Sequence, residues 1–522
     1  MFLIRLNYNS KTGAGHYMRI VRLLKEIRSH KIKFKIKIIL DKKIKNLFYE
    51  NSFSHIFIYN KKRFKNEIDD AKKIKKIIHA NKSKFLILDD YRLGYKWEKI
   101  VKSESIKLIL IDDLINKKHI CDYYINFKDL ENDEKIKLKK NILVNDKEII
   151  GHRFAIIDNK LNKLNKLNKI KKILFYPGNN GNPELFYNLI ASLLNEAKKK
   201  SILISIDLFL GKNNLNSSKF NYLKKYYKNF NIIKNQFNIH EYLNKSDLYF
   251  GFSGNSIYEN SYLNLISFLF PISINQKNKT NNMEKLGHYL IFKKGDLNKT
   301  NKITKLFFKI LPNISKIKKD FFKKNDISKN GAKNIIQELF NKKNFYKNIY
   351  ESSIQNKYKI SKLKNEDINQ YLFFRNKKIN RENMISSKII ENIDHYNWWF
   401  DEKFKSRNNF KIEIGYNDKI FIWSKIVNQK KNKYLIGGWF SSGKDISIKH
   451  KIIALNWQLQ ITKKHKIPWI AVIKKNNFTT YKLNSLIGFK TVKENTRIYF
   501  DIIEYFKIFP KQYYLMSYFY HD

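Results

Sequence analysis

The stretch from Lys11 to Arg19, KTGAGHYMR, decides the fold of the first part of the chain. It follows an apolar segment at residues 2–6 with the pattern of a strand, and it leads into apolar residues at helical spacing between Ile20 and Ile27. The pattern therefore predicts a strand, a glycine turn and a helix. Because Gly13 and Gly15 have no side chains, a ligand can approach the backbone closely, and the first helical turn offers unpaired N–H groups to an anion. The stretch predicts a phosphate-binding turn.

Two polar side chains at the start of this helix are candidate functional groups. His16 and Arg19 are three residues apart, so they project from roughly the same face of the helix. Histidine titrates near neutral pH, and arginine is a fixed cation. We therefore expect His16 to act as a base and Arg19 to contact an anionic ligand. A glycine turn before a helix is also common as a plain tight connection, and the remainder of the chain decides between these interpretations.

Length and composition limit the class of protein. A chain of 522 residues is too long for one core, so about three domains are expected. The formal net charge of +58 is typical of nucleic-acid-binding proteins, but the lysines are spread over nearly every segment and form no single stripe. We therefore predict no nucleic-acid partner, and we keep a basic nucleic-acid-binding protein as the non-enzyme alternative.

The cysteine content and the apolar segments indicate the cellular compartment of the protein. Cys121 is the only cysteine, which excludes an internal disulfide framework and a cysteine-rich zinc site. No His, Asp and Glu cluster has metal-ligand spacing, so we expect no metal. The longest apolar run, residues 263–274, is broken by polar residues and Pro271, and no basic and apolar leader is evident. We predict a cytoplasmic protein without an integral membrane segment. Nothing in the sequence specifies an oligomeric state.

The first half alternates short apolar segments with lysine-rich helical patterns, which is typical of a parallel sheet covered by helices. The predicted strands after the first are residues 34–40, 55–59, 84–88, 107–111 and 123–126. Polar residues follow two of them: Asp89, Asp90 and Tyr91 after one, Asp112 and Asp113 after the next. An open parallel sheet binds its ligand at this edge, but an acidic pair also caps the turn that follows, and we favour capping for Asp112 and Asp113.

A second block repeats this architecture. The segment 158–172 contains the repeat LNKLNKLNK, which predicts a linker between a domain at 1–157 and a domain at 173–342. The strands predicted in the second domain are 173–176, 202–208, 231–233, 248–251 and 268–272. We therefore predict two Rossmann-like α/β domains that face one another across a cleft, an arrangement that binds nucleotide sugars.

The loop after residues 248–251 is a second candidate anion site. Glu259 lies one turn into the helix that follows, where a carboxylate can accept from a pair of ribose hydroxyls. The alternative is an ordinary N-cap with an acidic residue in the first turn. The residues at the start of this helix are small and offer hydroxyls and backbone N–H groups: Ser253, Gly254, Asn255 and Ser256.

An ordered set of motifs over about the first 340 residues resembles a known family. The motifs are Gly13-x-Gly15-His16-x-x-Arg19, Leu88-Asp89-Asp90-Tyr91, Trp97-Glu98, Ile111-Asp112-Asp113-Leu114, Cys121-Asp122, Ser253-Gly254-Asn255, Tyr258-Glu259, Asn275-Gln276 and Leu286-Gly287. Together they resemble the UDP-sugar hydrolase family of pseudaminic acid biosynthesis. That family is GT-B-like and is related to the two-domain glycosyltransferases that build the peptidoglycan disaccharide.

The resemblance implies a reaction. It implies hydrolysis of UDP-2,4-diacetamido-2,4,6-trideoxy-β-L-altropyranose at the anomeric carbon, which gives UDP and the free sugar for nonulosonic acid synthesis and flagellin glycosylation. UDP is already a good leaving group, so the reaction needs a positioned water, a base, and stabilisation of the departing diphosphate. No cofactor or metal is implied. The alternative enzyme is a GT-B-type glycosyltransferase with the same two domains.

The resemblance also implies roles for individual residues. His16 is the expected base, Tyr91 is a second catalytic candidate that contacts the sugar, and Glu259 binds the ribose. The remaining residues implied in binding the UDP-sugar are Gly13, Gly15, Arg19, Ser253, Gly254, Asn255, Ser256, Asn275 and Gln276.

Residues 357–522 have a different pattern. Their first motifs are Arg375-Asn376, Asn380-Arg381, Met384, Ile393, His395 and Trp398-Trp399, which resemble the start of acyl-CoA-dependent amino-sugar N-acetyltransferases of the GNAT type. A strand at 434–440, a helix at 448–461 and a strand at 469–473 follow in the order of that fold. His395 and the tryptophans either bind a substrate or pack in a core.

The second resemblance implies acetyl-CoA as a cofactor and acetylation of a 4-amino sugar before hydrolysis. The usual glycine-rich pyrophosphate turn is absent, so we expect Gly443 and Lys444 at the start of the helix to replace it, with Asn477 as a further contact. Asn484 stands where these enzymes often have the tyrosine that protonates the departing thiolate. The two alternatives are an active acetyltransferase and a docking or stabilising module.

Overall fold

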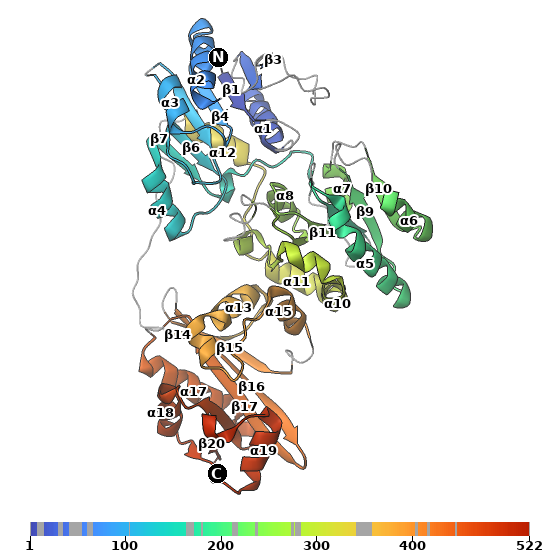
Figure 1. Ribbon diagram of the computed structural model, residues 1–522, viewed down its shortest axis with the longest axis vertical. Helices are drawn as coiled ribbons and strands as arrows, with labels where there is room; N and C mark the ends of the chain where they lie inside the picture. Colours follow the sequence, from blue (N-terminus) through green and yellow to red (C-terminus); the bar gives the residue numbers. More distant parts are fainter. Residues whose placement is uncertain are drawn as a thin grey trace. The chain divides into compact units, whose positions relative to one another are not determined.

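The structure of the 522-residue chain is a computed structural model (Figure 1). It divides into two compact units, residues 1–304 with 314–347 and residues 305–313 with 348–522. The residues that the structure describes are 2–7, 15–29, 35–40, 55–59, 66–103, 105–162, 172–178, 181–210, 218–234, 239–272, 276, 283–340, 358–401, 406–414, 418–443 and 446–520.

The first unit begins with a seven-stranded sheet in the order β3-β2-β1-β4-β5-β6-β7, in which all pairs are parallel. Its strands are β1 (Phe2–Leu6), β2 (Ile36–Leu40), β3 (His55–Tyr59), β4 (Phe85–Asp89), β5 (Lys107–Ile111), β6 (His119–Asn126) and β7 (Ile142–Ile150). The predicted strands are confirmed, and β7 was missed because it lies at the sheet edge and exposes several polar residues. The chain order reverses between β1 and β4, the position at which open α/β sheets bind ligands.

Helices cover both faces of this sheet because successive strand residues point to opposite sides. Phe2, Ile4 and Leu6 belong to a core that includes α1 and α12, whereas Leu3 belongs to a core with α2 and α3. Four helices follow β1, β3, β4 and β6 in turn: α1 (Gly15–Ser29), α2 (Glu67–Ala80), α3 (Tyr95–Val101) and α4 (Asn132–Asn141).

A second parallel sheet has six strands in the order β10-β9-β8-β11-β12-β13. Its strands are β8 (Lys172–Tyr176), β9 (Ser205–Phe209), β10 (Phe230–Ile233), β11 (Leu248–Gly251), β12 (Ile266–Leu269) and β13 (Leu290–Ile291). Its helices are α5 (Tyr187–Lys199), α6 (Ser218–Tyr226), α7 (His240–Lys245), α8 (Ser256–Tyr262) and α11 (Ile314–Phe321), and the division between the two units falls within α10 (Thr300–Ile310). The first unit therefore contains two Rossmann-like sheets, as predicted.

The last helix of the unit, α12 (Gly331–Phe340), returns to the first sheet (Figure 1). The ring of Phe340 packs edge-on against those of Phe2 and Phe85, with centroids 6.3 and 5.6 Å apart. Gly331 lies so close to Ala155 that a Cβ would come within 1.9 Å of its carbonyl oxygen, so only glycine permits this approach. The chain therefore crosses from the first sheet to the second and back.

The second unit is built on a seven-stranded mixed sheet in the order β14-β15-β16-β17-β18-β20-β19. Its strands are β14 (Tyr358–Lys362), β15 (Asn408–Ile414), β16 (Asp418–Gln429), β17 (Asn432–Ser441), β18 (Trp469–Lys474), β19 (Lys490–Thr491) and β20 (Tyr513–Tyr518). Its helices are α13 (Ile368–Asn376), α14 (Lys378–Glu382), α15 (Asn392–Trp399), α17 (Ile448–Thr462), α18 (Phe478–Leu486) and α19 (Arg497–Phe506). Only β17 and β18 pair in parallel, and they do so over two positions.

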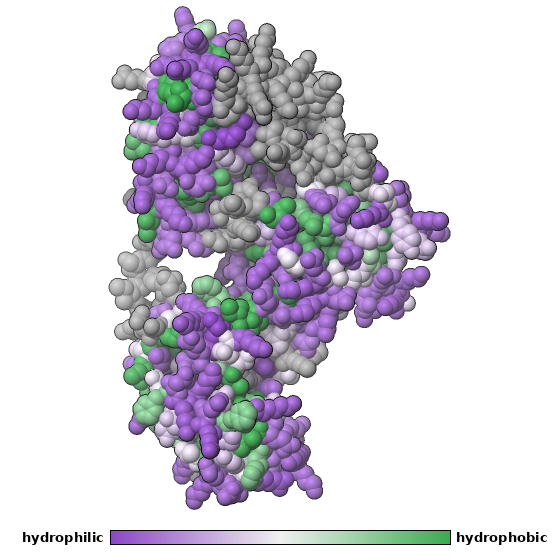
Figure 2. Space-filling view, viewed as in Figure 1, coloured by the Kyte–Doolittle hydropathy of each residue, from purple (hydrophilic) through white to green (hydrophobic). Residues whose placement is uncertain are grey.

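The visible surface of both units is mostly hydrophilic, with apolar residues scattered among the polar ones (Figure 2). Helix α2 shows how this arises: Ala71, Ile74 and Ile78 face the sheet, and its lysines face outward. Within the described parts of the chain, no helix combines the length and the apolar composition needed to cross a membrane.

Candidate functional site

The first group of site residues lies at the carboxyl ends of β1 and β4. Leu6 at the end of β1 pairs with Asp89 at the end of β4, and α1 begins at Gly15. His16 in the first turn of α1 reaches this edge, and its Nδ1 lies 2.5 Å from Oδ1 of Asp89. Because a carboxylate only accepts, Nδ1 holds the proton and Nε2 is left as the basic nitrogen. The His16 side chain is nearly buried, and Asp89 is fully buried.

Arg19, one turn after His16, binds the same carboxylate. Its Nε donates to Oδ2 of Asp89 at 2.6 Å, and its Nη2 contacts Oδ1. Burial alone would raise the pKa of Asp89, but the charges of Arg19 and then of His16 hold this pKa below its ordinary value. Asp89 is therefore an anion that orients the imidazole. Nη1 of Arg19 lies 3.5 Å from Asp113, so the guanidinium that we predicted as a ligand contact is already paired.

Tyr91, Asp112 and Asp113 complete this edge of the sheet. The Tyr91 ring stands edge-on to the His16 ring at 4.8 Å between centroids, and its hydroxyl donates to Asp113 Oδ2 at 2.9 Å. Burial and then the charge of Asp113 raise the pKa of Tyr91 well above its ordinary value, so its phenol is a donor and not a base. Asp112 accepts from two backbone N–H groups of the next turn, which confirms its predicted capping. Asp113, for which we also predicted capping, contacts Tyr91 and Arg19.

The second group of site residues surrounds Glu259 on α8. Its Oε1 lies 2.8 Å from Nη2 of Arg22 and 3.3 Å from Nε2 of His240. Burial would raise the pKa of Glu259, but Arg22 and then His240 lower it to about 2. Arg22 also lies 3.2 Å from Asp158. Helix α1 therefore contributes His16 and Arg19 to the first group and Arg22 to the second.

The loop between β11 and α8 has the small residues that we predicted as an anion site. Ser253 is fully buried, and its Oγ has no hydrogen-bond partner among the described residues. A Cβ on Gly254 would meet no atom within 4 Å, so the backbone there is open to a ligand. Ser256 Oγ lies 3.2 Å from the hydroxyl of Tyr249, and Tyr258 donates its hydroxyl to the carbonyl of Phe127 at 3.1 Å.

The remaining predicted contacts are placed as follows. Gln276 accepts from the backbone N–H of Ile272 at 3.0 Å. Gly13, Asn275, Lys444 and most of the predicted linker lie outside the described residues. Sequence reasoning missed Arg22 and His240. Arg22 continues the three-residue spacing of His16 and Arg19, so the spacing was visible in the sequence, whereas His240 is distant in the chain and had no such signal.

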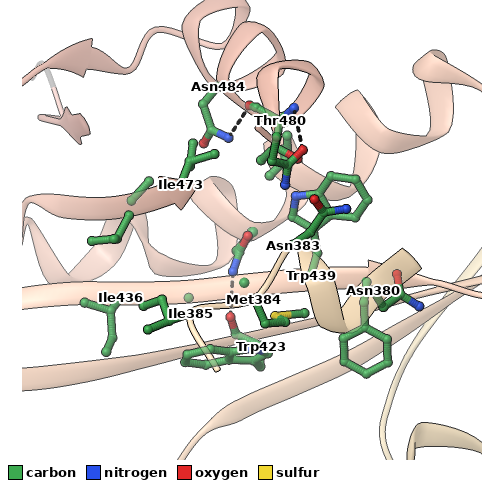
Figure 3. Close-up of a pocket in the computed structure, with 18 of the residues that line it drawn as sticks. Asn380, Asn383, Met384, Ile385, Trp423, Ile436, Trp439, Ile473, Thr480 and Asn484 are labelled. Atoms are coloured by element: carbon green, nitrogen blue, oxygen red, sulfur yellow. Dashed lines mark hydrogen bonds between the residues drawn. The ribbon is translucent and has the colours of Figure 1, made fainter. Parts of the chain in front are cut away.

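The second unit contains a cavity of about 460 Å³ between β17 and β18 and the helices around them. Figure 3 shows Trp423 on the strand side of this cavity, with Thr480 and Asn484 of α18 opposite. His395 also lines it, donates Nε2 to the carbonyl of Ile368 at 2.8 Å, and has a pKa that burial lowers to about 4. His395 is therefore neutral at physiological pH.

Gly443 and Asn477, which we predicted to bind acetyl-CoA, lie at the N-terminal ends of two different helices. Gly443 precedes α17, and its carbonyl accepts from Ser441 Oγ at 2.9 Å. Asn477 lines the cavity and caps α18, because its side chain accepts from the backbone N–H of Thr480. Asn484 also lines the cavity and donates to the carbonyl of Thr480 at 2.8 Å. In neither unit do the described residues contain three or more His, Cys, Asp or Glu side chains grouped as metal ligands.

Comparison with known proteins gives structural neighbours only. No protein-family model matches the sequence, and no curated protein matches it. A glycosyltransferase from Rickettsia africae is 15% identical with a TM-score of 0.44, and the alignment covers 65% of this chain and 98% of that one. MurG from Acinetobacter baumannii is 10% identical with a TM-score of 0.43, over 64% of this chain and 98% of that one. UDP-GlcNAc 2-epimerase from Neisseria meningitidis is 11% identical with a TM-score of 0.39, over 65% and 99%. At these low identities the similarity is one of backbone path and says nothing about the reaction that this chain catalyses.

Proposed function

We propose that the first unit hydrolyses a UDP-activated diacetamido-trideoxy sugar at its anomeric carbon, without a metal, and releases UDP and the free sugar. The observation that supports this most directly is the pair of His16 and Asp89, placed by β1, β4 and α1 where the sheet order reverses. The sugar class follows from the motif resemblance, and the chemistry follows from the residues.

In the proposed reaction His16 is the general base. Its Nε2 takes a proton from a water molecule as the oxygen attacks the anomeric carbon, and the bond from that carbon to the UDP oxygen breaks. Asp89 accepts from Nδ1 and stabilises the imidazolium that forms. Arg19 keeps Asp89 ionised throughout. The proton then leaves His16 to solvent, and UDP departs as an anion without needing an acid.

Glu259 is proposed to bind the ribose. Arg22 and His240 both contact Oε1, so we assign Oε2 to the ribose hydroxyls. The carboxylate is fully ionised because its pKa is about 2. A contact to the nucleoside is shared by the bound substrate and the transition state, so it affects affinity and not turnover. Glu259→Ala should therefore raise KM and the Kd for UDP together, by about tenfold to a hundredfold, at unchanged kcat.

The test is a purified protein incubated with a panel of UDP-diacetamido sugars in water enriched in ¹⁸O, without an acceptor. Hydrolysis at the anomeric carbon releases UDP and places ¹⁸O in the sugar and none in UDP. A glycosyltransferase releases UDP only when an acceptor is added, and an epimerase changes the sugar without releasing it. Absence of UDP without an acceptor, or ¹⁸O found in UDP, would rule out the proposed reaction.

For the second unit we propose an N-acetyltransferase that acetylates a 4-amino sugar before the first unit hydrolyses it. The supporting observation is the cavity beside the parallel pair β17 and β18, which Asn477 and Asn484 line. Acetyl-CoA would be bound at the start of α17 beside Gly443. Incubation with acetyl-CoA and a UDP-4-amino sugar tests this, since acetylation releases free CoA thiol. If free thiol forms no faster with the sugar than without it, the second unit has only a docking or stabilising role.

A further inference from the structure

Two cationic side chains line the cavity of the second unit, and no acidic side chain is among the described residues that line it. Arg375 comes from the last turn of α13, and Arg407 lies directly before β15. Two separate elements of the fold therefore direct positive charge to one cavity. The other polar side chains that line it are amides and hydroxyls or are neutral, such as His395.

Neither guanidinium is fully satisfied by the protein. Nη1 of Arg375 and Nε of Arg407 are buried and have no hydrogen-bond acceptor among the described residues. Nη2 of Arg375 donates to the carbonyl of Ser386 at 3.0 Å. Burial lowers the pKa of both guanidiniums below the ordinary value, which shows that their surroundings do not compensate the charge. A half-buried cation whose buried N–H groups have no acceptor is unfavourable unless a ligand supplies one.

Two indole rings contact Arg407, and both arginines act on the phenol of Tyr371. The Arg407 guanidinium lies over the Trp423 ring at 4.3 Å and over the Trp398 ring at 5.1 Å from the centroids. Such contacts orient a guanidinium without neutralising it. Tyr371 lines the same cavity, and burial raises its pKa to about 12 although Arg407 and Arg375 both act to lower it. Both cations therefore lie close to one phenol.

We propose that this cavity binds a phosphate-bearing dianion, a phosphomonoester or a diphosphate, through Arg375 and Arg407. Two uncompensated positive charges match a dianion better than a single carboxylate, and the planar guanidinium fits phosphate oxygens in a bidentate manner. A cavity of about 460 Å³ has room for a phosphate group joined to a small organic body, which the indole rings and amides would contact. The proposal is independent of the hydrolysis assigned to the first unit.

The diphosphate could belong to CoA or to a UDP-sugar, and the experiment distinguishes these sources. The full-length protein is titrated with inorganic diphosphate, with CoA and with UDP, and tryptophan fluorescence is followed. Six of the seven tryptophans lie in the second unit, and two of them flank Arg407, so the signal reports chiefly on this cavity. Saturable quenching by inorganic diphosphate and by at least one of the two nucleotides is expected. The nucleotide whose Kd rises in the arginine variants of the cavity identifies the source.

Matched variants decide whether the two arginines are responsible. Arg375→Gln and Arg407→Gln should each raise the Kd by about tenfold to a hundredfold, because each removes a charge-assisted hydrogen bond. Arg407→Lys keeps the charge but loses the planar fork, so its Kd should fall between wild type and the Gln variant. Arg497→Gln removes the same charge from an exposed position outside the cavity and should leave the Kd unchanged.

Near-UV circular dichroism checks that each variant keeps its packing. If Arg407→Gln does not fold, Arg375→Gln and Arg407→Lys still decide the matter. The proposal is overturned if no ligand gives saturable quenching of the wild-type protein. It is also overturned if the folded variants bind as tightly as wild type.

Discussion

The two units use arginines that are buried or half-buried in opposite ways. In the first unit every arginine near the candidate site has a carboxylate: Arg19 binds Asp89, and Arg22 binds Glu259. In the second unit, Arg375 and Arg407 each have a buried N–H group without an acceptor among the described residues, and Arg407 lies over the Trp423 ring. A paired arginine fixes the charge and position of its carboxylate, whereas an unpaired one gains its partner only from a ligand. The first site is therefore built to position a base, and the second to bind an anion.

The difference also predicts where substitutions act. Changing a member of a buried ion pair leaves its partner uncompensated, so stability falls together with the catalytic or binding role of that pair. Changing a half-buried cation that has no carboxylate partner removes an unfavourable contribution to folding, so affinity for an anion falls while stability holds or rises. Four residues test this contrast, and the largest effect is expected at His16.

His16→Ala should abolish hydrolysis while UDP still binds. His16 is the only predicted base, and a general base contributes about 100-fold to 10,000-fold to the rate. Steady-state release of UDP measures the effect, and calorimetric titration with UDP measures binding. Arg28→Ala, exposed in the last turn of the same helix, is the matched control and should behave as wild type. Near-normal turnover by His16→Ala would place the base elsewhere, and the raised pKa of Tyr91 makes that residue a poor replacement.

Asp89→Asn should weaken both activity and folding. The substitution leaves the buried Arg19 with only its longer contact to Asp113, and breaking a buried pair costs about 3–5 kcal/mol of unfolding free energy. The amide can also donate to Nδ1 of His16, which would favour the wrong tautomer. Urea unfolding followed by far-UV circular dichroism measures the stability. A variant with unchanged stability would contradict the view that the pair of Arg19 and Asp89 is structural as well as functional.

Much of the fold and part of the site were visible in the sequence, for physical reasons. The strand, glycine turn and helix at residues 2–27 follow from local periodicity, and the positions of His16 and Arg19 on one helical face follow from spacing. Local pattern could not give the partners of Arg19 and Arg22. Asp89 lies 70 residues from Arg19, and Glu259 lies on α8, which follows a strand of the second sheet. Sequence reasoning placed Asp89 at a strand end but could not decide between capping and catalysis, since that depends on strand order.

The cavity of the second unit shows the same limit. The motif Arg375-Asn376 was visible, but Arg407 was not singled out, because no periodicity or spacing connects it with α13. The rings of Trp398 and Trp423 bring Arg407 to the cavity, and these contacts exist only in the folded sheet. A half-buried charge without a carboxylate partner is a property of the tertiary structure, so the sequence alone could not predict it.

The stability of α8 should depend on acid through Glu259. The folded pKa is about 2 and the ordinary value is 4.5, so the carboxylate contributes about 3 kcal/mol at neutral pH. Because the folded pKa is the lower one, this contribution is complete above about pH 4.5 and is lost as the pH falls toward 2. Hydrogen exchange of residues 256–262, corrected for intrinsic rates, measures it. Glu259→Gln should be less protected at neutral pH and change less between pH 6 and 3, and equal pH profiles would contradict the assignment.

We expect the smallest effect at Asn477, where two substitutions distinguish a structural role from a binding role. Its side chain caps α18 by accepting from the backbone N–H of Thr480, and removal of such a cap costs about 1 kcal/mol. Asn477→Ala should therefore destabilise the second unit by about that amount, as measured by urea unfolding followed by tryptophan fluorescence. Asn477→Ser restores a good cap with a shorter side chain, so it should recover most of the stability. If Asn477 also contacts acetyl-CoA, both variants should bind it more weakly than wild type in calorimetric titration. If the serine variant binds as tightly as wild type, the residue serves the helix alone, and the anion affinity of the cavity then depends on its two unpaired arginines.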